Sequence, residues 1–252
     1  MKSFSAVTIG WLALTGFAAQ SPVRQVYRAT FDYSYASLRG DVTRRERVVG
    51  TLTEDRMAAT SRWSAVTVST AQQLNPFGTG EPRAFMEGFS YPSGAPGMTT
   101  DAFFRGIPAS ATQERNLVWD TQMFEIFGLK ELDRLKLGDT YHFQPASDVS
   151  LAGAGTFTNR DVQLTLIGTT TRNGRLCAVV GYQAFFNRVQ LQLPALTMTG
   201  RSHYWGQIWV ALPAKELEHA TLFEDVLGEV TQGPQPAQPV SVFRSGMLER
   251  VQ

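Results

Sequence analysis

The sequence is short of cysteine, histidine and lysine. Cys177 is the only cysteine among the 252 residues, so a disulfide within the chain is excluded and the fold must depend on its own hydrophobic core. The three histidines, His142, His203 and His219, show no metal-ligand spacing, and no phosphate-binding glycine loop of either standard spacing occurs. The sequence therefore predicts neither a metal site nor a cofactor.

Charge excess and long apolar runs are also lacking, apart from the first residues. A formal net charge of +1 gives no overall attraction for nucleic acid, so we expect no nucleic-acid partner. Residues 1–19 combine Lys2 with the apolar run Ala6–Ala19, which ends in small residues and is typical of a secretory signal peptide. The run is short for a membrane span, although an uncleaved anchor is the alternative. We expect cleavage after Ala18, export to the periplasm or the exterior, and no transmembrane span in the mature protein.

Alternation of apolar and polar residues predicts long antiparallel strands. Asn173-Gly174 lies between two such runs and predicts a β-hairpin, because a type I′ turn needs positive φ at both central residues. Residues 232–239 read as a linker, and the strand after it is expected to pair with the main sheet. The predicted strands are Val23–Leu38, Val42–Leu52, Arg56–Thr70, Asp161–Thr171, Arg175–Leu193, Arg201–Leu212, Glu216–Val230 and Val240–Val251.

An insert at about residues 72–137 interrupts the strands. Gln72–Pro108 is dense in proline and glycine, which predicts loops with one short strand at Arg83–Tyr91. Asn116–Leu137 is the best helical candidate, with a cap at Asp120 and a break into two short helices at Gly128.

Together these patterns predict a mainly β protein. Residues 20–252 are expected to form a single domain, a curved antiparallel sheet or half-barrel with a short α-helical insert. The apolar stripe of the helix must be buried, and the sheet is the only large apolar surface available to it. We therefore expect the helix and the aromatic loop Phe77–Phe104 to lie over the concave face of the sheet.

Aromatic side chains are concentrated in this insert and in the strand that follows Gly200. Such side chains either fill the domain core or form a lid over an apolar cavity. The segment Tyr204–Val210 is bulky on both faces, which suits core packing on one side and a second layer or a ligand on the other, with carbohydrate stacking as one use. The candidate ligand-binding residues are Phe103, Phe104, Trp119, Phe124, Phe127, Trp205 and Trp209.

Signals for catalysis are weak. Ser202 lacks the second glycine of a nucleophile elbow, and Cys177 lies in an apolar run that predicts a buried, inert thiol. Glu216, Glu218 and Glu224 could serve as paired carboxylates for glycoside hydrolysis, but surface carboxylates beside arginine are the better interpretation. The segment that carries them is predicted as a strand, with a helix after Pro213 as the alternative. We therefore predict no catalytic residue.

Two resemblances bear on function. The run from Asn116-Leu117-Val118-Trp119-Asp120 through Gly200-Arg201-Ser202-His203-Tyr204-Trp205-Gly206 looks like secreted bacterial proteins of unknown function, which implies no activity. The layout of signal peptide, long strands and helical insert is similar to that of periplasmic lipid carriers of the lipoprotein-localisation type. That resemblance implies a half-barrel holding a lipid or other apolar ligand against helices. The expected function is a non-enzymatic carrier; a structural or interaction module with an envelope protein partner comes next, and a hydrolase last.

Overall fold

The computed structural model describes residues 24–93, 100, 102–144, 147–151 and 153–251. The predicted signal peptide, residues 1–19, therefore lies outside the described residues. Within the described ranges, no helix is both long enough and apolar enough to cross a lipid bilayer.

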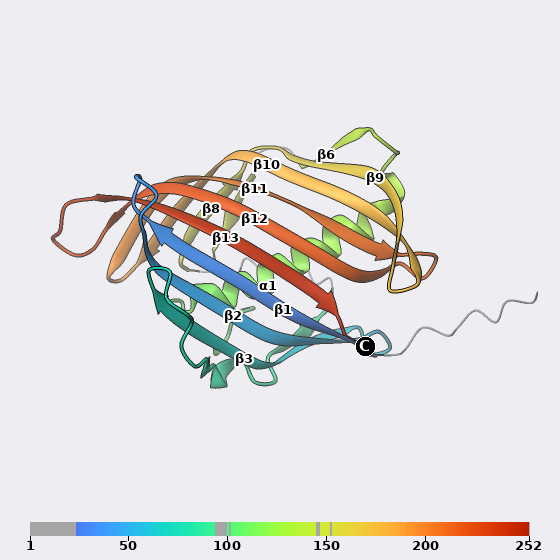
Figure 1. Ribbon diagram of the computed structural model, residues 1–252, viewed down its shortest axis with the longest axis horizontal. Helices are drawn as coiled ribbons and strands as arrows, with labels where there is room; N and C mark the ends of the chain where they lie inside the picture. The colour runs from blue at the N-terminus through green and yellow to red at the C-terminus, as the bar shows by residue number, and fades with distance from the viewer. Residues whose placement is uncertain (1–23, 94–99, 101, 145–146, 152, 252) are drawn as a thin grey trace, which may run out of the picture.

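Antiparallel strands make up most of the described chain and join into one sheet (Figure 1). Its order is β4-β3-β2-β1-β13-β12-β11-β10-β8-β7, while β5 pairs with β3, β9 with β10, and β6 with β9. In the described residues the sheet is not closed into a barrel, and it curves around the helix. The predicted fold class is therefore confirmed. The strands are β1 (Arg24–Ala36), β2 (Val42–Asp55), β3 (Thr60–Gln72), β4 (Glu81–Pro82), β5 (Ser90–Pro92), β6 (Thr140–Gln144), β7 (Ser147–Ser150), β8 (Gly155–Asn159), β9 (Val162–Arg172), β10 (Arg175–Leu193), β11 (Leu196–Ala211), β12 (Glu216–Thr231) and β13 (Gln238–Arg250).

The predicted hairpin between β9 and β10 is present. Asn173 and Gly174 have φ values of 49° and 74°, so both central residues are in the left-handed region that a type I′ turn requires. Arg172 and Arg175 pair directly across it, and the pairing continues along both strands to Val162. This two-residue turn therefore sets the register of the hairpin.

The last strand returns to the middle of the sheet. β13 pairs with β1 along one edge, where Tyr27 faces Arg250, and with β12 along the other, where His219 faces Glu249. The predicted strand after the linker is therefore confirmed. It begins at Gln238 and ends at Arg250, so its first residues take up the end of the predicted linker.

The helical segment starts earlier than predicted and is not broken at its glycine. α1 spans Thr112–Glu125, the π-helical η2 continues it over Ile126–Lys130, and the short η3 follows at Leu132–Arg134. The prediction of a cap at Asp120 is wrong, because this residue lies inside α1.

Gly128 lies inside the continuous helical run. Its lack of a side chain allows that run to approach the sheet closely. A Cβ added to Gly128 would stand 2.6 Å from Cγ2 of Ile208 on β11 and 3.3 Å from Cγ2 of Val210. Glycine is here a contact residue, since any side chain would push the helix off the strand. The sequence pattern does not separate this role from that of a helix breaker.

The predicted strand at residues 83–91 is wrong. This stretch follows β4 and contains the short 3-10 helix η1 at Ala84–Met86 and the start of β5. Gly88 adopts a φ of 77° between η1 and β5, and its amide donates to the carbonyl of Trp63 on β3. The segment therefore follows the edge of the sheet in short pieces.

The main core fills the space between the helical segment and the inner face of the sheet, the face toward α1. The core includes Trp63 on β3, whose side chain is fully buried. Phe31 on β1 packs over Gly246 on β13, where an added Cβ would stand 2.2 Å from the ring. The positions that build the core also position the polar and aromatic groups described next.

Candidate functional site

An apolar cavity lies between α1 and the inner face of the sheet. Its volume is about 300 Å³, and it is partly open to solvent. The helix contributes Trp119, Met123 and Phe127, while β8, β9 and β12 contribute Phe157, Val162 and Leu222, among others. We call this space the inner cavity. Its remaining lining residues are Asn116, Asp120, Ile126, Phe143, Val149, Leu151, Asn159, Tyr204, Glu224 and Arg244.

A second, smaller cavity of about 170 Å³ adjoins the first. It extends along the same face of the sheet, between Tyr33 on β1 and Met198 on β11. The two cavities have in common the lining residues Asn116, Trp119, Leu151, Phe157, Glu224 and Arg244. These shared side chains make the two spaces neighbouring parts of one groove beneath the helix.

A group of buried charges lies at the junction of the two cavities. Arg244 on β13 donates one hydrogen bond to Glu224 on β12 and another to Asp120 on α1. The side chains of Arg244 and Asp120 are each 12% exposed and that of Glu224 is 6% exposed, so the group is largely withdrawn from water. Ser202 donates to Glu224 at 2.5 Å. We call these four residues the Arg244 cluster.

Burial dominates the ionisation of this cluster. It raises the pKa of Asp120 to about 7; the charge of Arg244 opposes the rise, and the charge of Glu224 adds to it. Burial likewise raises the pKa of Tyr33, whose ring lies beneath the Arg244 guanidinium, to about 12. Near neutral pH Asp120 therefore titrates within the cluster, while the adjacent Tyr33 stays neutral.

Two further polar groups face the inner cavity without carrying charge. The Tyr204 hydroxyl donates to Oδ1 of Asn159 at 2.9 Å, and burial raises the pKa of that hydroxyl. An apolar chamber with a few converging polar groups is the usual composition of a small-molecule site.

The predicted binding residues in the insert are all aromatic, and they have different positions relative to the inner cavity. Trp119 and Phe127 line the inner cavity. Phe104 packs edge-on against Trp119, with 5.1 Å between ring centroids, and against Phe103 at 4.9 Å, so both support the wall from behind. Phe124 is fully buried against Tyr182 and does not line the cavity.

The two tryptophans of β11 lie on the opposite, outer face of the sheet. They alternate with Tyr204 and Ile208, which are buried on the inner face. Trp205 stacks on Phe223 with 6.0 Å between ring centroids, and Trp209 packs against His219 at 4.8 Å. The structure therefore does not bring these tryptophans together with the insert aromatics.

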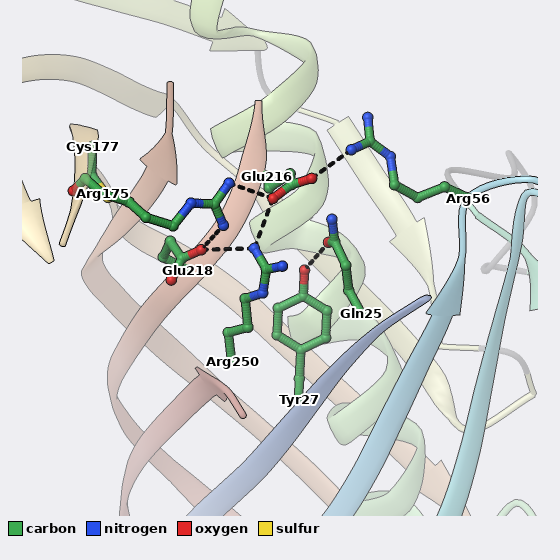
Figure 2. A network of polar contacts seen from close by, with 8 residues as sticks. All are labelled: Gln25, Tyr27, Arg56, Arg175, Cys177, Glu216, Glu218 and Arg250. Carbon is green, nitrogen blue, oxygen red and sulfur yellow. Dashed lines mark hydrogen bonds and ion pairs between the residues drawn. The ribbon is translucent and has the colours of Figure 1, made fainter. Parts of the chain in front are cut away.

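A second polar network lies where β12 begins and β13 ends (Figure 2). Glu216 accepts from Arg56 and from Arg250, both at 2.7 Å, and also from Arg175. Glu218 accepts from Arg250 at 2.8 Å and from Arg175. Through these bonds the network joins β10, β12 and β13 to the turn after β2.

The expectation that Glu216, Glu218 and Glu224 are surface carboxylates is therefore wrong. Their exposed fractions are 1%, 2% and 5%, although the expected arginine partners are present. A register shift at Trp209 and Val210 sets Glu216 and Glu218 apart from the regular alternation that turns Glu224 toward the inner cavity. The three do not form one site, whereas the predicted strand that carries them is confirmed.

The histidines and the cysteine stay apart from the cavity. His142 contacts Asp161 at 2.8 Å, His203 packs against Phe186, and His219 contacts Glu249. Among the described residues, no three His, Cys, Asp or Glu side chains are grouped so that they could hold a metal ion. Cys177 is fully buried, as predicted, and burial raises the pKa of its thiol.

Arg244, the charge at the centre of the cluster, is not among the residues predicted from the sequence. One signal for it was available. In β13 the alternate residues Val242, Arg244, Gly246 and Leu248 share one face, and an arginine on such a face must find a buried partner. The identity of that partner, on a helix far away in the sequence, follows only from the fold.

A comparison of the sequence with protein-family models finds no matching family, and a comparison with curated proteins finds no matching relative. The function is therefore inferred from the inner cavity and the Arg244 cluster.

Proposed function

We propose that this protein is an exported, non-enzymatic binding or carrier protein for an apolar small molecule, which it holds in the inner cavity. The observation that carries the proposal is a chamber of about 300 Å³ whose wall is mostly apolar and whose few polar groups converge at one place. The partial opening gives a ligand a route that does not require the sheet to unfold.

The size of the chamber limits the ligand. Small-molecule sites commonly range over about 300–1,000 Å³. The inner cavity is at the lower end of this range, and the adjoining space adds about 170 Å³. A single acyl chain or a small ring system suits this space better than a lipid with several chains.

The export part of the proposal is supported by the sequence alone. The basic start, the apolar run and the small residues at its end form the pattern of a signal peptide. The periplasm or the exterior would then be the place where the ligand is met.

The test is a titration with a neutral fluorescent probe, N-phenyl-1-naphthylamine, whose emission reports an apolar environment. We expect saturable binding at a stoichiometry of one. Met123 lines the inner cavity, so Met123→Trp should fill part of the cavity and lower the affinity for the probe by at least tenfold. The matched control is Met57→Trp, at a position that is 83% exposed. Absence of saturable binding by the wild-type protein would overturn the proposal.

A second candidate function, an interaction module for an envelope protein, is favoured by the outer face. Trp205, Phe223 and Phe243 are 37%, 37% and 42% exposed and form a row across β11, β12 and β13. A contiguous exposed apolar row is typical of a contact surface. Photocrosslinking from position 225, beside this row, tests it. One defined adduct in the envelope fraction, lost in Phe223→Ser, would support the module, and a lack of any adduct would oppose it.

A further inference from the structure

We infer that the inner cavity selects an amphiphile with a positively charged head group, a protonated amine, over one with a carboxylate. This inference rests on the proposed binding function, because it concerns the ligand of the same cavity. It follows from the charges that line the cavity and from the absence of a second cation among its described lining residues.

The charged lining of the inner cavity is unbalanced. Asp120, Glu224 and Arg244 are its charged lining residues in the described ranges. With both carboxyl groups ionised, one guanidinium between two carboxylates leaves one formal negative charge in a space largely withdrawn from water. Charges interact strongly there and are costly to leave uncompensated. A carboxylate head group would add a third negative charge, whereas an ammonium group would restore neutrality.

A second cation, Arg115, borders the adjoining cavity but is not among the lining residues of the inner cavity. Its guanidinium lies over the Phe104 ring at 5.0 Å and donates to the Ile107 carbonyl at 2.9 Å, whereas Arg244 and Glu224 are the charges that act on Asp120. Tyr33 and Tyr204 stay neutral because burial raises the pKa of both.

The remaining polar neighbours are neutral or already paired. Ser202, Asn116 and Asn159 carry no charge. Farther along the adjoining cavity, Glu46 accepts from Tyr35 at 2.8 Å and is paired with Arg44. The negative charge at the Arg244 cluster is thus not offset from another element packed against it.

The protonation of Asp120 couples ligand binding to pH. Its pKa of about 7 means that a proton partly neutralises the cluster at neutral pH. An ammonium group would bind the ionised form and so replace that proton. Because apparent affinity scales with the competent fraction, amine binding should strengthen by about tenfold between pH 6 and pH 8. A neutral alcohol does not compete with the proton and should show no such gain.

The experiment compares three matched amphiphiles, dodecylamine, dodecanol and dodecanoate. Each displaces N-phenyl-1-naphthylamine from the full-length protein, below its aggregation concentration, at pH 6, 7 and 8. The amine stays cationic and the acid stays ionised over this range, since free amines and carboxylic acids titrate well outside it. We expect dodecylamine to bind at least tenfold more tightly than dodecanoate at pH 7 and to gain about tenfold between pH 6 and pH 8.

Two variants separate the role of the cluster from general electrostatics. Asp120→Asn should lower the ratio of amine affinity to alcohol affinity and abolish its pH dependence, because the removed carboxyl group carries both effects. Asp133→Asn, on η3, is the matched control: this carboxylate is 74% exposed and pairs with Lys215 away from the cavity. Its affinity ratio should equal that of the wild-type protein, and circular dichroism verifies that both variants fold.

The outcomes distinguish the inference from the function on which it rests. If neither the probe nor any amphiphile binds, both the carrier function and the head-group preference are wrong. If the probe saturates but dodecanoate binds as tightly as dodecylamine, the head-group preference alone is wrong. An amine preference that persists in Asp120→Asn with its pH dependence would also overturn the assignment to this cluster.

Discussion

Arg244 on β13 and Asp120 on α1 form a buried ion pair between residues that are 124 positions apart in the sequence. The pair ties the helix to the strand in the middle of the sheet, at the wall of the inner cavity. A buried pair of this kind is valuable mainly because breaking it leaves a charge uncompensated. The position of α1 against β13 is therefore linked to the ionisation of Asp120.

The first prediction concerns the pH dependence of stability. The pKa of Asp120 rises on folding from a usual value of 3.8 to about 7, so the folded state binds an extra proton between these values. The stability that this proton confers is fully present below about pH 4 and is lost as the pH rises through about 7. The Asp120→Asn variant has no carboxyl group at this position, so its stability does not fall in this way as the pH rises. The free energy of unfolding of this variant, relative to wild type, should increase by about 1.4 kcal/mol per pH unit in that window.

Urea denaturation at pH 4, 5, 6, 7 and 8 measures this difference. Asp133→Asn serves as the control, since its carboxylate is largely exposed and should give a difference that does not change with pH. Parallel stability curves for wild type and Asp120→Asn would show that Asp120 titrates normally in the folded protein.

The second prediction concerns the core beneath the cavity. Phe124 is fully buried against Tyr182, so Phe124→Ala should lower the free energy of unfolding by about 3–5 kcal/mol. Probe binding should change less than in Met123→Trp, because Phe124 does not line the inner cavity. Phe186→Ala, at a ring that is 66% exposed, is the control and should change stability by about 0.5 kcal/mol or less. Chemical denaturation of both variants decides the matter.

The third prediction concerns the glycine in η2. In an exposed helix Gly→Ala stabilises by about 1 kcal/mol, but the new methyl group of Gly128→Ala would stand 2.6 Å from Ile208. We expect the sign to reverse, with a loss of about 1–3 kcal/mol from overpacking. Adding Ile208→Ala should remove the clash, so the two changes together should cost less than the sum of the two alone. Additive losses in the double mutant would indicate that the contact between residues 128 and 208 does not set the distance between the helix and the sheet.

The fourth prediction concerns Cys177. Its side chain is fully buried, and burial raises the pKa of the thiol, so little reactive thiolate is exposed. The native protein should react with a thiol reagent at neutral pH on the order of a hundredfold more slowly than the urea-unfolded protein. Equal rates before and after unfolding would mean that the strand opens readily.

The fifth prediction concerns processing. Small residues at positions 16 and 18 predict cleavage after Ala18, so the exported protein should begin at Ala19. Amino-terminal sequencing of the exported fraction is the measurement. A chain that keeps Met1 and sediments with membranes would instead indicate an uncleaved anchor.

Local signals explain how much of the fold could be predicted. The bounds of β10 agree with the prediction because Asn173-Gly174 and Pro194 mark the chain reversals at its ends. The helix bounds were less accurate, since the pattern around Asp120 and Gly128 fits a cap and a break as well as it fits a buried charge and a close contact. A glycine or aspartate has one identity in sequence and several uses in a fold.

The candidate site was predictable only in part. Phe127 is predicted from the apolar stripe that an amphipathic helix must bury, and it lines the inner cavity together with the predicted Trp119. Trp205 and Trp209 were assigned to the same ligand, although alternation along β11 places them on the outer face. The Arg244 cluster depends on pairings between β12, β13 and α1, and such long-range partners are not encoded in any local pattern.

The central place of β13 has a consequence for how the chain reaches its folded state. Residues 27 and 250 pair side by side, so the sheet is joined across its middle by a strand near the end of the chain. Until β13 is present, β1–β3 and β8–β12 are two separate pieces, each with an unpaired edge.

Contacts between such distant segments form slowly, because the entropy of closing a long loop is lost before the contacts stabilise the chain. Before β13 docks, each half-sheet exposes the edge strand that β13 will later pair, and unpaired edges of this kind favour association with other chains. The docking of β13 between β1 and β12 therefore also protects the folding chain from aggregation.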